Sequence, residues 1–529
     1  MSAEGEHKPG HHAAHRASGR AGGLTRSGTR PGGRRAGHRS GSRLAPEPRV
    51  RRLPALLLVV ALLAGGGLAS AVVATPPAEP FHPAPAALAS LAAPAASDAS
   101  SWYCTGGSGP QNPIAQPTLY LVNSGSQTVQ GTITVYDGTG RSATRPVSVP
   151  ALGEATASPG SILPDDWLAS RVDLAGGAVA VSELVAGSTG WSVAPCSSVA
   201  APNWYFASGS TTVGNALYVS LFNPTPSAAV VDLRFVTGQG VAQPPPFQGL
   251  IVEPGAVVTA QVMAYVQNQA TVATEVVARS GKVVATELQV HRGAVRSGIS
   301  LRLGTPAPAS RWYLPRSSNP PGGTNQLVVF NPGADAARVT VAVRLSSGPV
   351  SPLTETVPPR STWTLDLTQQ TRIPPSTDYA VSVTTRKGRG IVVDRVTGAP
   401  KGAAAPQWGA VTAIAGATAA SPSGWWSLPN PALDATRAEP GAHATAVALL
   451  NPGGRTVRAF VGPLGSERGR GGRTVRVRPH AMVEVAASSL SSIGTEPVGV
   501  KADLPLAVVE DVTPSGAVGA VSASGVPQS

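Results

Sequence analysis

Cysteine is almost absent from this chain: two residues occur among 529, Cys104 and Cys196. They do not form a C-x-x-C pair, which argues against a reactive thiol pair. Instead they stand 92 positions apart (196 − 104) and bracket one stretch of the chain. An isolated pair in an exported domain is most simply a disulfide. We therefore predict a bridge between Cys104 and Cys196, with a reactive thiol pair as the alternative.

Catalytic signatures are also missing. The sequence contains no H-E-x-x-H, G-x-S-x-G or S-x-x-K motif. The histidines beyond residue 74 are few and scattered: His82, His291, His443 and His480. A catalytic triad forms only in three dimensions, so the sequence does not exclude one. Because none of the four repeats described below carries extra polar residues, we expect a protein that is not an enzyme, with no catalytic residue, no cofactor and no metal site.

Basic charge is scarce outside the beginning of the chain. Residues 1–52 contain twelve Lys or Arg and three Glu, so nine of the thirteen net positive charges (12 − 3 = 9) lie there. The remainder, with 29 basic and 25 acidic residues, is too balanced for a surface that follows nucleic-acid phosphates. We therefore expect no nucleic-acid partner. Residues 1–52 lack large apolar side chains and predict a disordered basic arm. Such an arm is compatible with contact to anionic lipid, and a histidine metal tract is the alternative.

Charge is wholly absent from residues 53–74, which are rich in Leu, Val and Ala. About twenty apolar residues span a bilayer, and the arginines directly before the segment keep that end in the cytoplasm. We expect a transmembrane signal-anchor here, a plasma-membrane location, and an extracellular remainder. The sequence Ala69-Ser70-Ala71 resembles a cleavage site, so a secreted product is the alternative. Residues 75–100, dominated by Ala, Pro and Ser, predict a stalk.

Four segments with the same landmarks follow, at residues 101–200, 201–307, 308–420 and 421–523. Each opens with a tryptophan: Trp102, Trp204, Trp312 and Trp426. Each continues with an apolar strand that ends in asparagine: Asn123, Asn223, Asn331 and Asn451. Each closes on a valine-rich strand that carries a carboxylate: Glu183, Glu287, Asp394 and Glu510. The recurring order predicts a tandem array of homologous modules, and such arrays are usually built for binding rather than chemistry.

Within the segments the hydrophobic period is two. In residues 338–345, the apolar side chains Val339, Val341, Val343 and Leu345 alternate with Arg, Thr and Ala. Alternation with β-branched residues is typical of half-buried antiparallel strands. Glycine and proline total 111 residues (60 + 51) and supply frequent turns. We therefore predict an all-β fold: four antiparallel β-sandwich modules behind one transmembrane helix and a disordered head.

Each landmark has a structural and a functional interpretation. The opening tryptophans favour packing in the core or at module junctions, with sugar stacking as the alternative. The asparagines stand at strand ends, mostly before proline, and favour a turn role. The carboxylates favour an internal partner, an arginine or a backbone amide. A calcium site is the alternative, but one carboxylate per module is too few ligands.

These motifs carry a resemblance. The opening aromatic, the L-x-x-x-N-P strand end, the V-x-P turn and the V-V-x-[DE] closing strand resemble an uncharacterised family of actinobacterial membrane-anchored or secreted repeat proteins, a domain of unknown function. The modules are also similar to the β-sandwich of the sensory rhodopsin transducers. The resemblance covers residue 101 to about 520 and implies fold and location. It offers no catalytic residue, and the fourth segment departs most, since Trp426-Ser427 replaces the Trp-Tyr start.

Together these observations predict a non-enzymatic, membrane-anchored extracytoplasmic protein of the cell envelope, with a binding or scaffolding role. Its membrane contact would be residues 53–74, and its partner a wall polymer or an envelope membrane protein. One alternative is an accessory subunit of a membrane glycosyltransferase or transporter. The other is a cleaved, secreted adhesin or lectin.

Overall fold

The computed structural model describes residues 89–398, except 91, 94–95, 294–296 and 320, and parts of the remainder: 411–415, 425–428, 442–465, 471–486, 489, 497–514, 521–524 and 526–527. All of them belong to one of the two compact units of the chain, residues 83–529. The arm and anchor expected from the sequence, and most of the stalk, lie outside the described residues. None of the helices in the described part has the length and hydrophobicity needed to cross a membrane.

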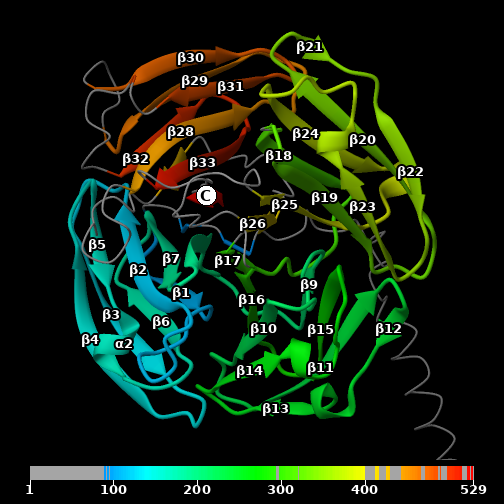
Figure 1. Cartoon of the computed structure of the whole chain (residues 1–529). Helices are drawn as coiled ribbons and strands as arrows, with labels where there is room; N and C mark the ends of the chain where they lie inside the picture. Colours follow the sequence, from blue (N-terminus) through cyan, green and yellow to red (C-terminus); the bar gives the residue numbers. More distant parts are fainter. Residues whose placement is uncertain are drawn as a thin grey trace, which may run out of the picture. The chain divides into compact units, whose positions relative to one another are not determined.

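The described residues form antiparallel β-sheets, as the period-two patterns predict (Figure 1). Helix occurs there only as short turns: α2 (Pro159–Ile162), η1 (Pro245–Phe247), η2 (Val262–Ala264), η3 (Leu367–Gln369) and η4 (Arg386–Gly388). Each segment contributes two sheets. We call the sheet that contains the tryptophan strand the Trp sheet, and the sheet built around the asparagine strand the Asn sheet.

The first two segments share one strand order. In the first segment the Trp sheet contains, in order, β1 (Ser100–Cys104), β6 (Ala169–Leu174), β3 (Val129–Tyr136) and β4 (Ser142–Val149). Its Asn sheet contains β5 (Gly153–Ala157), β2 (Gln116–Asn123), β7 (Val179–Gly187) and β8 (Gly190–Pro195). In the second segment the Trp sheet contains, in order, β9 (Asn203–Phe206), β15 (Val272–Ser280), β11 (Ala229–Thr237) and β12 (Gly240–Ala242), and β13 (Leu250–Val252) also pairs with β11. Its Asn sheet contains β14 (Val257–Gln261), β10 (Asn215–Phe222), β16 (Val284–Arg292) and β17 (Ser297–Leu303).

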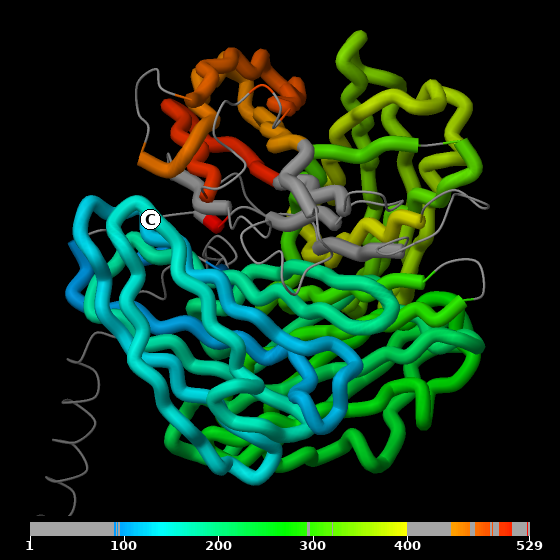
Figure 2. The backbone as a smooth tube through the Cα atoms, turned by 60° about the vertical axis from the view of Figure 1, so that its left-hand side comes forward, coloured from blue at the N-terminus to red at the C-terminus, as the bar shows by residue number. Residues whose placement is uncertain are grey.

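The same order returns in the later segments. In the third segment the Trp sheet contains, in order, β18 (Arg311–Ser318), β24 (Asp378–Thr385), β20 (Ala337–Leu345) and β21 (Gly348–Pro349), and β22 (Leu353–Val357) also pairs with β20. Its Asn sheet contains β23 (Ser361–Asp366), β19 (Thr324–Asn331), β25 (Val392–Gly398) and β26 (Val411–Ala415). In the fourth segment the Trp sheet contains, in order, β27 (Trp425–Leu428), β32 (Val498–Ala502), β29 (Val457–Pro463) and β30 (Arg473–Val477), with β35 (Val526–Pro527) added beside β27. Its Asn sheet contains β31 (Met482–Ala486), β28 (Ala442–Leu450), β33 (Ala507–Pro514) and β34 (Val521–Ser524). Figure 2 follows the chain through these sheets by colour.

The core of each sandwich lies between its Trp sheet and its Asn sheet. In the first segment Trp102, Ile133 and Val172 of the Trp sheet pack against Leu119 and Val179 of the Asn sheet. In β20 the burial of Val339, Val341 and Val343 alternates with exposed or half-buried neighbours, as the sequence predicts. The asparagine strands β2, β10 and β19 are instead buried along most of their length on both faces. A strand with two buried faces needs a second packing partner, and neighbouring segments provide it.

Adjacent segments pack against each other through hydrophobic side chains. Strand β17 contacts both β8 and β26, and β34 contacts β8. Leu301 of β17 packs with Ala194 of β8, and its backbone N–H donates to Ser192 Oγ at 3.0 Å. Val526 of β35, just beyond the expected end of the fourth segment at residue 523, joins the core of the first. The segments of this unit therefore pack directly against one another and are not joined by linkers alone.

The end of the expected stalk belongs to the first sandwich. Ala92 is fully buried in its core, and the carbonyl of Ala89 accepts from the N–H of Ser198 at 2.8 Å. Ser100 already begins β1. The described residues of this stretch therefore pair with the first segment through the carbonyls of Ala89 and Ala93, and Ala92 fits into its core.

Candidate functional site

The four asparagines occupy one structural position, the turn position expected from the sequence. Each side-chain amide donates to the carbonyl four residues ahead and to a carbonyl at the end of a Trp-sheet strand. Asn331 is typical, with 2.9 Å to Asp335 O and 3.0 Å to Val357 O, while its Oδ1 accepts from Gly333 N at 3.0 Å. Each asparagine thus closes its own turn and ties the Asn sheet to the Trp sheet.

The tryptophans lie inside the sandwiches. Trp102, Trp204 and Trp312 are fully buried. The indole of Trp204 donates to Val283 O at 2.7 Å, and that of Trp312 to Ile391 O at 2.9 Å. A sugar cannot stack on a ring with no exposed face, so these three indoles are not binding platforms. Trp426 lies on β27, and its side chain falls outside the described residues.

The repeated carboxylates share a strand but not one register. Glu183 (β7), Glu287 (β16) and Glu510 (β33) each pair with the residue four positions before the segment's asparagine. Asp394 on β25 pairs instead with Val328, three positions before Asn331. Side chains alternate between the two faces of a strand, so this single step sends Asp394 to the opposite face of its sheet. The four carboxylates thus lie on equivalent closing strands, as the recurring order predicts, but Asp394 stands one register position away from the other three.

Glu183 points into the first sandwich. It is almost fully buried, and its Oε2 accepts from Gly106 N at 2.9 Å, just beyond the tryptophan strand. Burial raises the pKa of Glu183 to about 7, and the hydrogen bond from Gly106 opposes that rise. An internal backbone amide is the kind of partner that the sequence suggested for this carboxylate.

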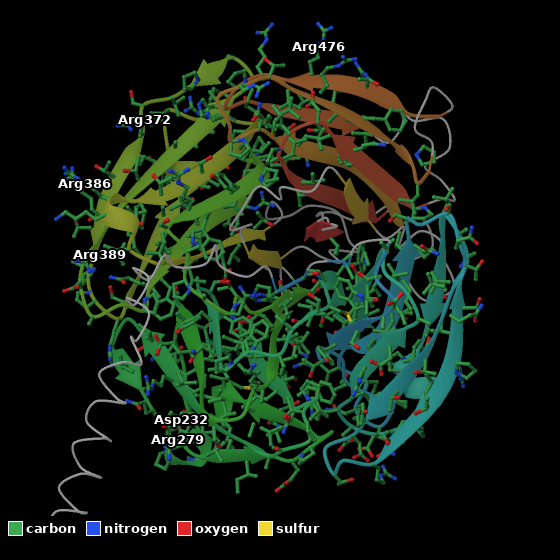
Figure 3. All side chains as sticks on the ribbon, turned by 180° about the vertical axis from the view of Figure 1, so that it is seen from behind. Asp232, Arg279, Arg372, Arg386, Arg389 and Arg476 are labelled. Carbon is green, nitrogen blue, oxygen red and sulfur yellow. A yellow bond between two sulfur atoms is a disulfide. The ribbon has the colours of Figure 1, made fainter. Side chains whose placement is uncertain are left out.

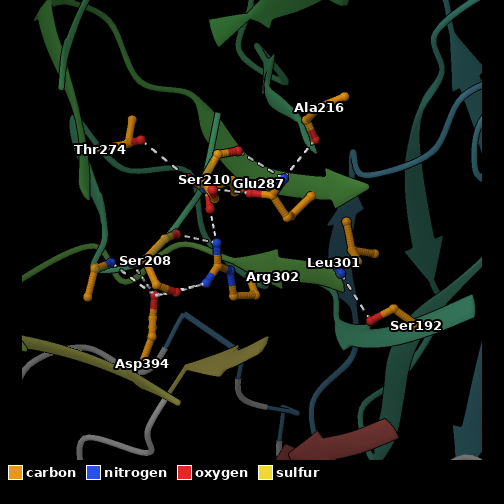
Figure 4. A network of polar contacts seen from close by, with 11 residues as sticks. Ser192, Ser208, Ser210, Ala216, Thr274, Glu287, Leu301, Arg302 and Asp394 are labelled. Atoms are coloured by element: carbon orange, nitrogen blue, oxygen red, sulfur yellow. Dashed lines mark hydrogen bonds and ion pairs between the residues drawn. The ribbon is translucent and has the colours of Figure 1, made fainter. Parts of the chain in front are cut away.

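Glu287 and Asp394 meet at one guanidinium (Figure 4). Arg302 of β17 donates from Nη2 to Glu287 Oε1 and from Nη1 to Asp394 Oδ2, the latter at 3.2 Å. It also donates to the hydroxyl and the carbonyl of Ser208, and Thr274 Oγ1 donates to Glu287 Oε2 at 3.2 Å. We call Ser208, Glu287, Arg302 and Asp394 the charge cluster. It joins the second segment to the third.

Asp394 also caps backbone of the preceding segment. Its Oδ2 accepts from Ala207 N at 3.0 Å and from Ser208 N at 2.9 Å, directly after the tryptophan strand β9. The corresponding residue of the second segment, Thr286, donates to Thr105 O after β1 at 3.0 Å. Asp394 and Thr286 thus hold the same position on their strands, and each side chain bonds backbone of the preceding segment, just after its tryptophan strand.

The charge cluster is almost fully buried. The side chains of Arg302, Glu287 and Asp394 are at most 2% exposed. Burial raises the pKa of Asp394, while Arg302 and the hydrogen bonds of Ser208 and Ala207 oppose the rise. A buried ion pair is tolerated only when its remaining polar atoms are satisfied. Both carboxylates are engaged by internal donors, while Nε of Arg302 has no hydrogen-bond partner among the described residues. The cluster therefore joins two segments with one buried polar atom left unsatisfied.

The predicted disulfide is confirmed. Cys104 and Cys196 are bridged, with their Cα atoms 4.8 Å apart, and both lie in the core of the first sandwich. Over the residues that the structure describes, no group of three or more His, Cys, Asp or Glu side chains could hold a metal ion.

A pocket of about 200 Å³ lies beside the charge cluster. Its lining comes from the second segment, including Asn215, Gln289 and His291, and from the third, including Thr324 and Gln326. Arg302 and Ser208 of the charge cluster form part of its wall. We call this cavity the junction pocket.

The family assignment rests on most of the array. Residues 169–488 match the model of a family of unknown function, DUF5719. The chain belongs to this family. The family resemblance expected from the sequence is therefore confirmed for DUF5719, and no curated protein matches the chain.

Several solved structures are similar to parts of this DUF5719 protein. The crystal structure of Thermotoga maritima 1070 shares 18% identity, with 21% of this chain and 94% of that chain covered and a TM-score of 0.19. The Anabaena sensory rhodopsin transducer shares 27% identity, with 16% and 92% covered and a TM-score of 0.15. A tetra-tandem repeat in the extending region of a large adhesion protein shares 12% identity, with 76% and 91% covered and a TM-score of 0.12. The transducer expected from the sequence is thus among the similar structures.

Sequence reasoning missed the residues that join the DUF5719 segments. Arg302 stands in the strand Ser297–Leu303, among Ile, Leu and Ser. A lone arginine in a strand of that kind is a signal for a buried ion pair, since an unpaired charge is rarely buried. Ser208, which bonds Asp394 of the next segment, gives no such signal, because serine is common at the surface.

Proposed function

We propose that this protein is a non-enzymatic, membrane-anchored extracytoplasmic scaffold of the cell envelope, with four β-sandwich modules outside the membrane. It would hold a wall polymer or an envelope membrane protein. The recurring strand order supports four modules, with boundaries near those of the four segments. The uncharged run at residues 53–74 and the basic residues before it support an anchor with the modules outside.

The observation that carries the proposal is the use made of the repeated carboxylates. Glu183 fixes the chain after its own tryptophan strand. Glu287 and Asp394 share Arg302 across a segment boundary. Carboxylates that are buried and bound to internal donors favour a rigid support. A catalyst would need an acid or base within reach of a substrate.

The disulfide supports an extracytoplasmic location. Structural disulfides persist in oxidising compartments and are rare in the cytosol. The bridge between Cys104 and Cys196 is buried in the first sandwich and spans most of that segment. A bridge of this kind favours a fold that forms after export.

The proposal is tested by crosslinking in intact cells, followed by capture of the full-length protein through a C-terminal tag. We expect the protein in the membrane fraction, crosslinked to wall polymer or to an envelope membrane protein. The matched control is the same chain with residues 53–74 replaced by a cleavable signal peptide, which should leave the membrane fraction. Recovery of the full-length protein from the cytosol, or from the medium without residues 53–74, would contradict the proposal.

A further inference from the structure

The junction pocket has the position and size of a small-molecule site. It lies between two packed segments, and clefts between domains are preferred ligand sites. Its volume of about 200 Å³ equals the share of liquid volume taken by roughly six or seven water molecules. Pockets for drug-sized molecules begin at about 300 Å³. The junction pocket therefore suits one compact polar molecule or one unit of a polymer.

Several lining side chains are held rigidly by the protein. Gln289 Oε1 accepts from Ser210 N at 2.7 Å, and Gln289 Nε2 donates to Ala216 O at 3.0 Å. Asn215 Nδ2 donates to Thr212 Oγ1 at 2.7 Å, which leaves Asn215 Oδ1 to face His291 Nδ1 at 2.7 Å. Side chains fixed in this way lose little entropy when a ligand binds.

The tautomer of His291 follows from this geometry. An amide oxygen only accepts hydrogen bonds, so His291 Nδ1 carries the proton and Nε2 is an acceptor. Burial lowers the pKa of His291 to about 4, so the ring is neutral at neutral pH. Arg302, the cationic residue of the lining, is paired with two carboxylates, Glu287 and Asp394. The pocket wall thus offers an anion no unpaired positive charge among the described residues.

Three lining side chains keep polar groups without a partner among the described residues: His291 through Nε2, Thr271 through its hydroxyl, and Gln326 through its amide. They come from both segments and combine an acceptor with groups that donate and accept. Trp, Tyr and Phe are absent from the described lining. The walls therefore match a solute that donates and accepts hydrogen bonds at several points and has no net charge.

We propose that the junction pocket binds one neutral polyhydroxylated unit, a monosaccharide that is free or forms the end of a glycan. A hydroxyl group both donates and accepts, so adjacent sugar hydroxyls meet His291 Nε2, Thr271 and Gln326 without leaving charge unpaired. An anionic ligand would meet a guanidinium already bound by two carboxylates. This inference deepens the proposed envelope function, which it relies on for the source of the ligand and not for binding itself.

Calorimetric titration of the purified full-length protein tests the pocket. The probes are glucose, galactose, mannose and arabinose, with glucuronate as the charged counterpart. We expect at least one neutral sugar to bind and glucuronate to bind more weakly. Thr271→Val removes the hydroxyl, and His291→Leu removes both ring nitrogens, Nδ1 that pairs with Asn215 and the free acceptor Nε2. Each variant should weaken binding roughly three- to tenfold. Thr362→Val changes a half-buried threonine of β23 outside the lining and should leave binding unchanged.

Thermal unfolding of each variant shows whether it is folded. If His291→Leu does not fold, Gln326→Leu replaces it, because Gln326 is exposed and its change should spare the core. Absence of binding by all four neutral sugars would overturn the proposal, as would equal binding of glucuronate or unchanged binding by the folded pocket variants. Failure of the crosslinking experiment would contradict the envelope function but would not affect the sugar titration of the purified protein. Failure of the proposed function and failure of the sugar site can therefore be told apart.

Discussion

Arg302 of the second segment and Asp394 of the third are joined across a segment boundary, with 3.2 Å between Nη1 and Oδ2. Both side chains are 2% exposed. Because Arg302 also binds Glu287 of its own sandwich, one guanidinium fixes the closing strands of two consecutive segments. The neighbouring hydrogen bonds from Ala207 and Ser208 to Asp394 aim the carboxylate. The orientation of the third segment against the second thus depends on a few polar atoms.

Replacing Arg302 with methionine should destabilise the array strongly. The substitution leaves two carboxylates buried without a counterion, and breaking a buried pair from one side typically costs about 3–5 kcal/mol. We expect a lower Tm and, because the second and third segments lose a shared contact, a broader transition in scanning calorimetry. The matched control is Arg389→Met, which removes an exposed arginine (Figure 3) paired with the exposed Asp335 and should shift Tm little. Equal unfolding profiles for the two variants would contradict a joint at Arg302.

The sequence predicted the strands of this protein better than its joints. The alternation in residues 338–345 predicts β20 because period two is a local property. The asparagine turns are equally local, since their partners lie two and four residues ahead. The face on which Asp394 lies is not local. A shift of one residue inverts every side chain of a strand, and a spacing known only to within a few residues cannot detect it.

The partner of Asp394 was also beyond reach of the sequence. Arg302 lies 92 positions before Asp394, in a different segment. Two residues at that separation meet only through the packing of β17 against β26, which depends on how the segments face each other. Local periodicity carries no information about that arrangement.

Glu183→Gln should make stability less dependent on pH. The folded-state pKa of Glu183, about 7, lies above the ordinary value of 4.5. Its contribution to stability is therefore fully present below pH 4.5 and is lost as the pH rises through 7. The full difference corresponds to about 3 kcal/mol. Glutamine keeps an acceptor for Gly106 N and cannot ionise, so we expect a higher Tm than wild type at pH 8 and a smaller gap at pH 5. Glu355→Gln, at an exposed site on β22, should reproduce the wild-type profile. A parallel profile for Glu183→Gln would show that the carboxyl does not titrate in this range.

Asn331→Ala should weaken the third sandwich. The substitution leaves the carbonyls of Asp335 and Val357 without their amide donor, and each buried group left unpaired costs about 1–3 kcal/mol. Asn112→Ala removes a half-buried asparagine from a loop of the first segment and serves as the comparison. Denaturant titration should show a lower midpoint for Asn331→Ala alone. Equal midpoints would mean that the cross-sheet hydrogen bonds contribute nothing net.

Removal of the disulfide should destabilise the first sandwich. Cys104 and Cys196 close a loop of 92 residues, for which the chain-entropy account gives up to about 4.5 kcal/mol. We expect the double variant Cys104→Ala/Cys196→Ala to unfold at a lower temperature than the oxidised protein. Non-reducing mass spectrometry of protein isolated from cells should find the bridge formed. Free thiols in that material would argue against an oxidising compartment and so against export.

Substitutions of Trp312 distinguish a core role from a sugar platform. Its indole has no exposed surface and donates to Ile391 O at 2.9 Å and to Ala309 O at 3.1 Å. Trp312→Ala leaves a cavity between the two sheets and should cost about 3–5 kcal/mol. Trp312→Phe keeps an aromatic ring but loses the indole donor, so its Tm should fall between wild type and Trp312→Ala. A platform role would give the opposite outcome, with stability unchanged in both variants and affinity for glucose, galactose, mannose or arabinose reduced. A graded loss of stability with sugar titrations unchanged in the folded Trp312→Phe protein would place Trp312 in the core and leave the junction pocket as the sugar site.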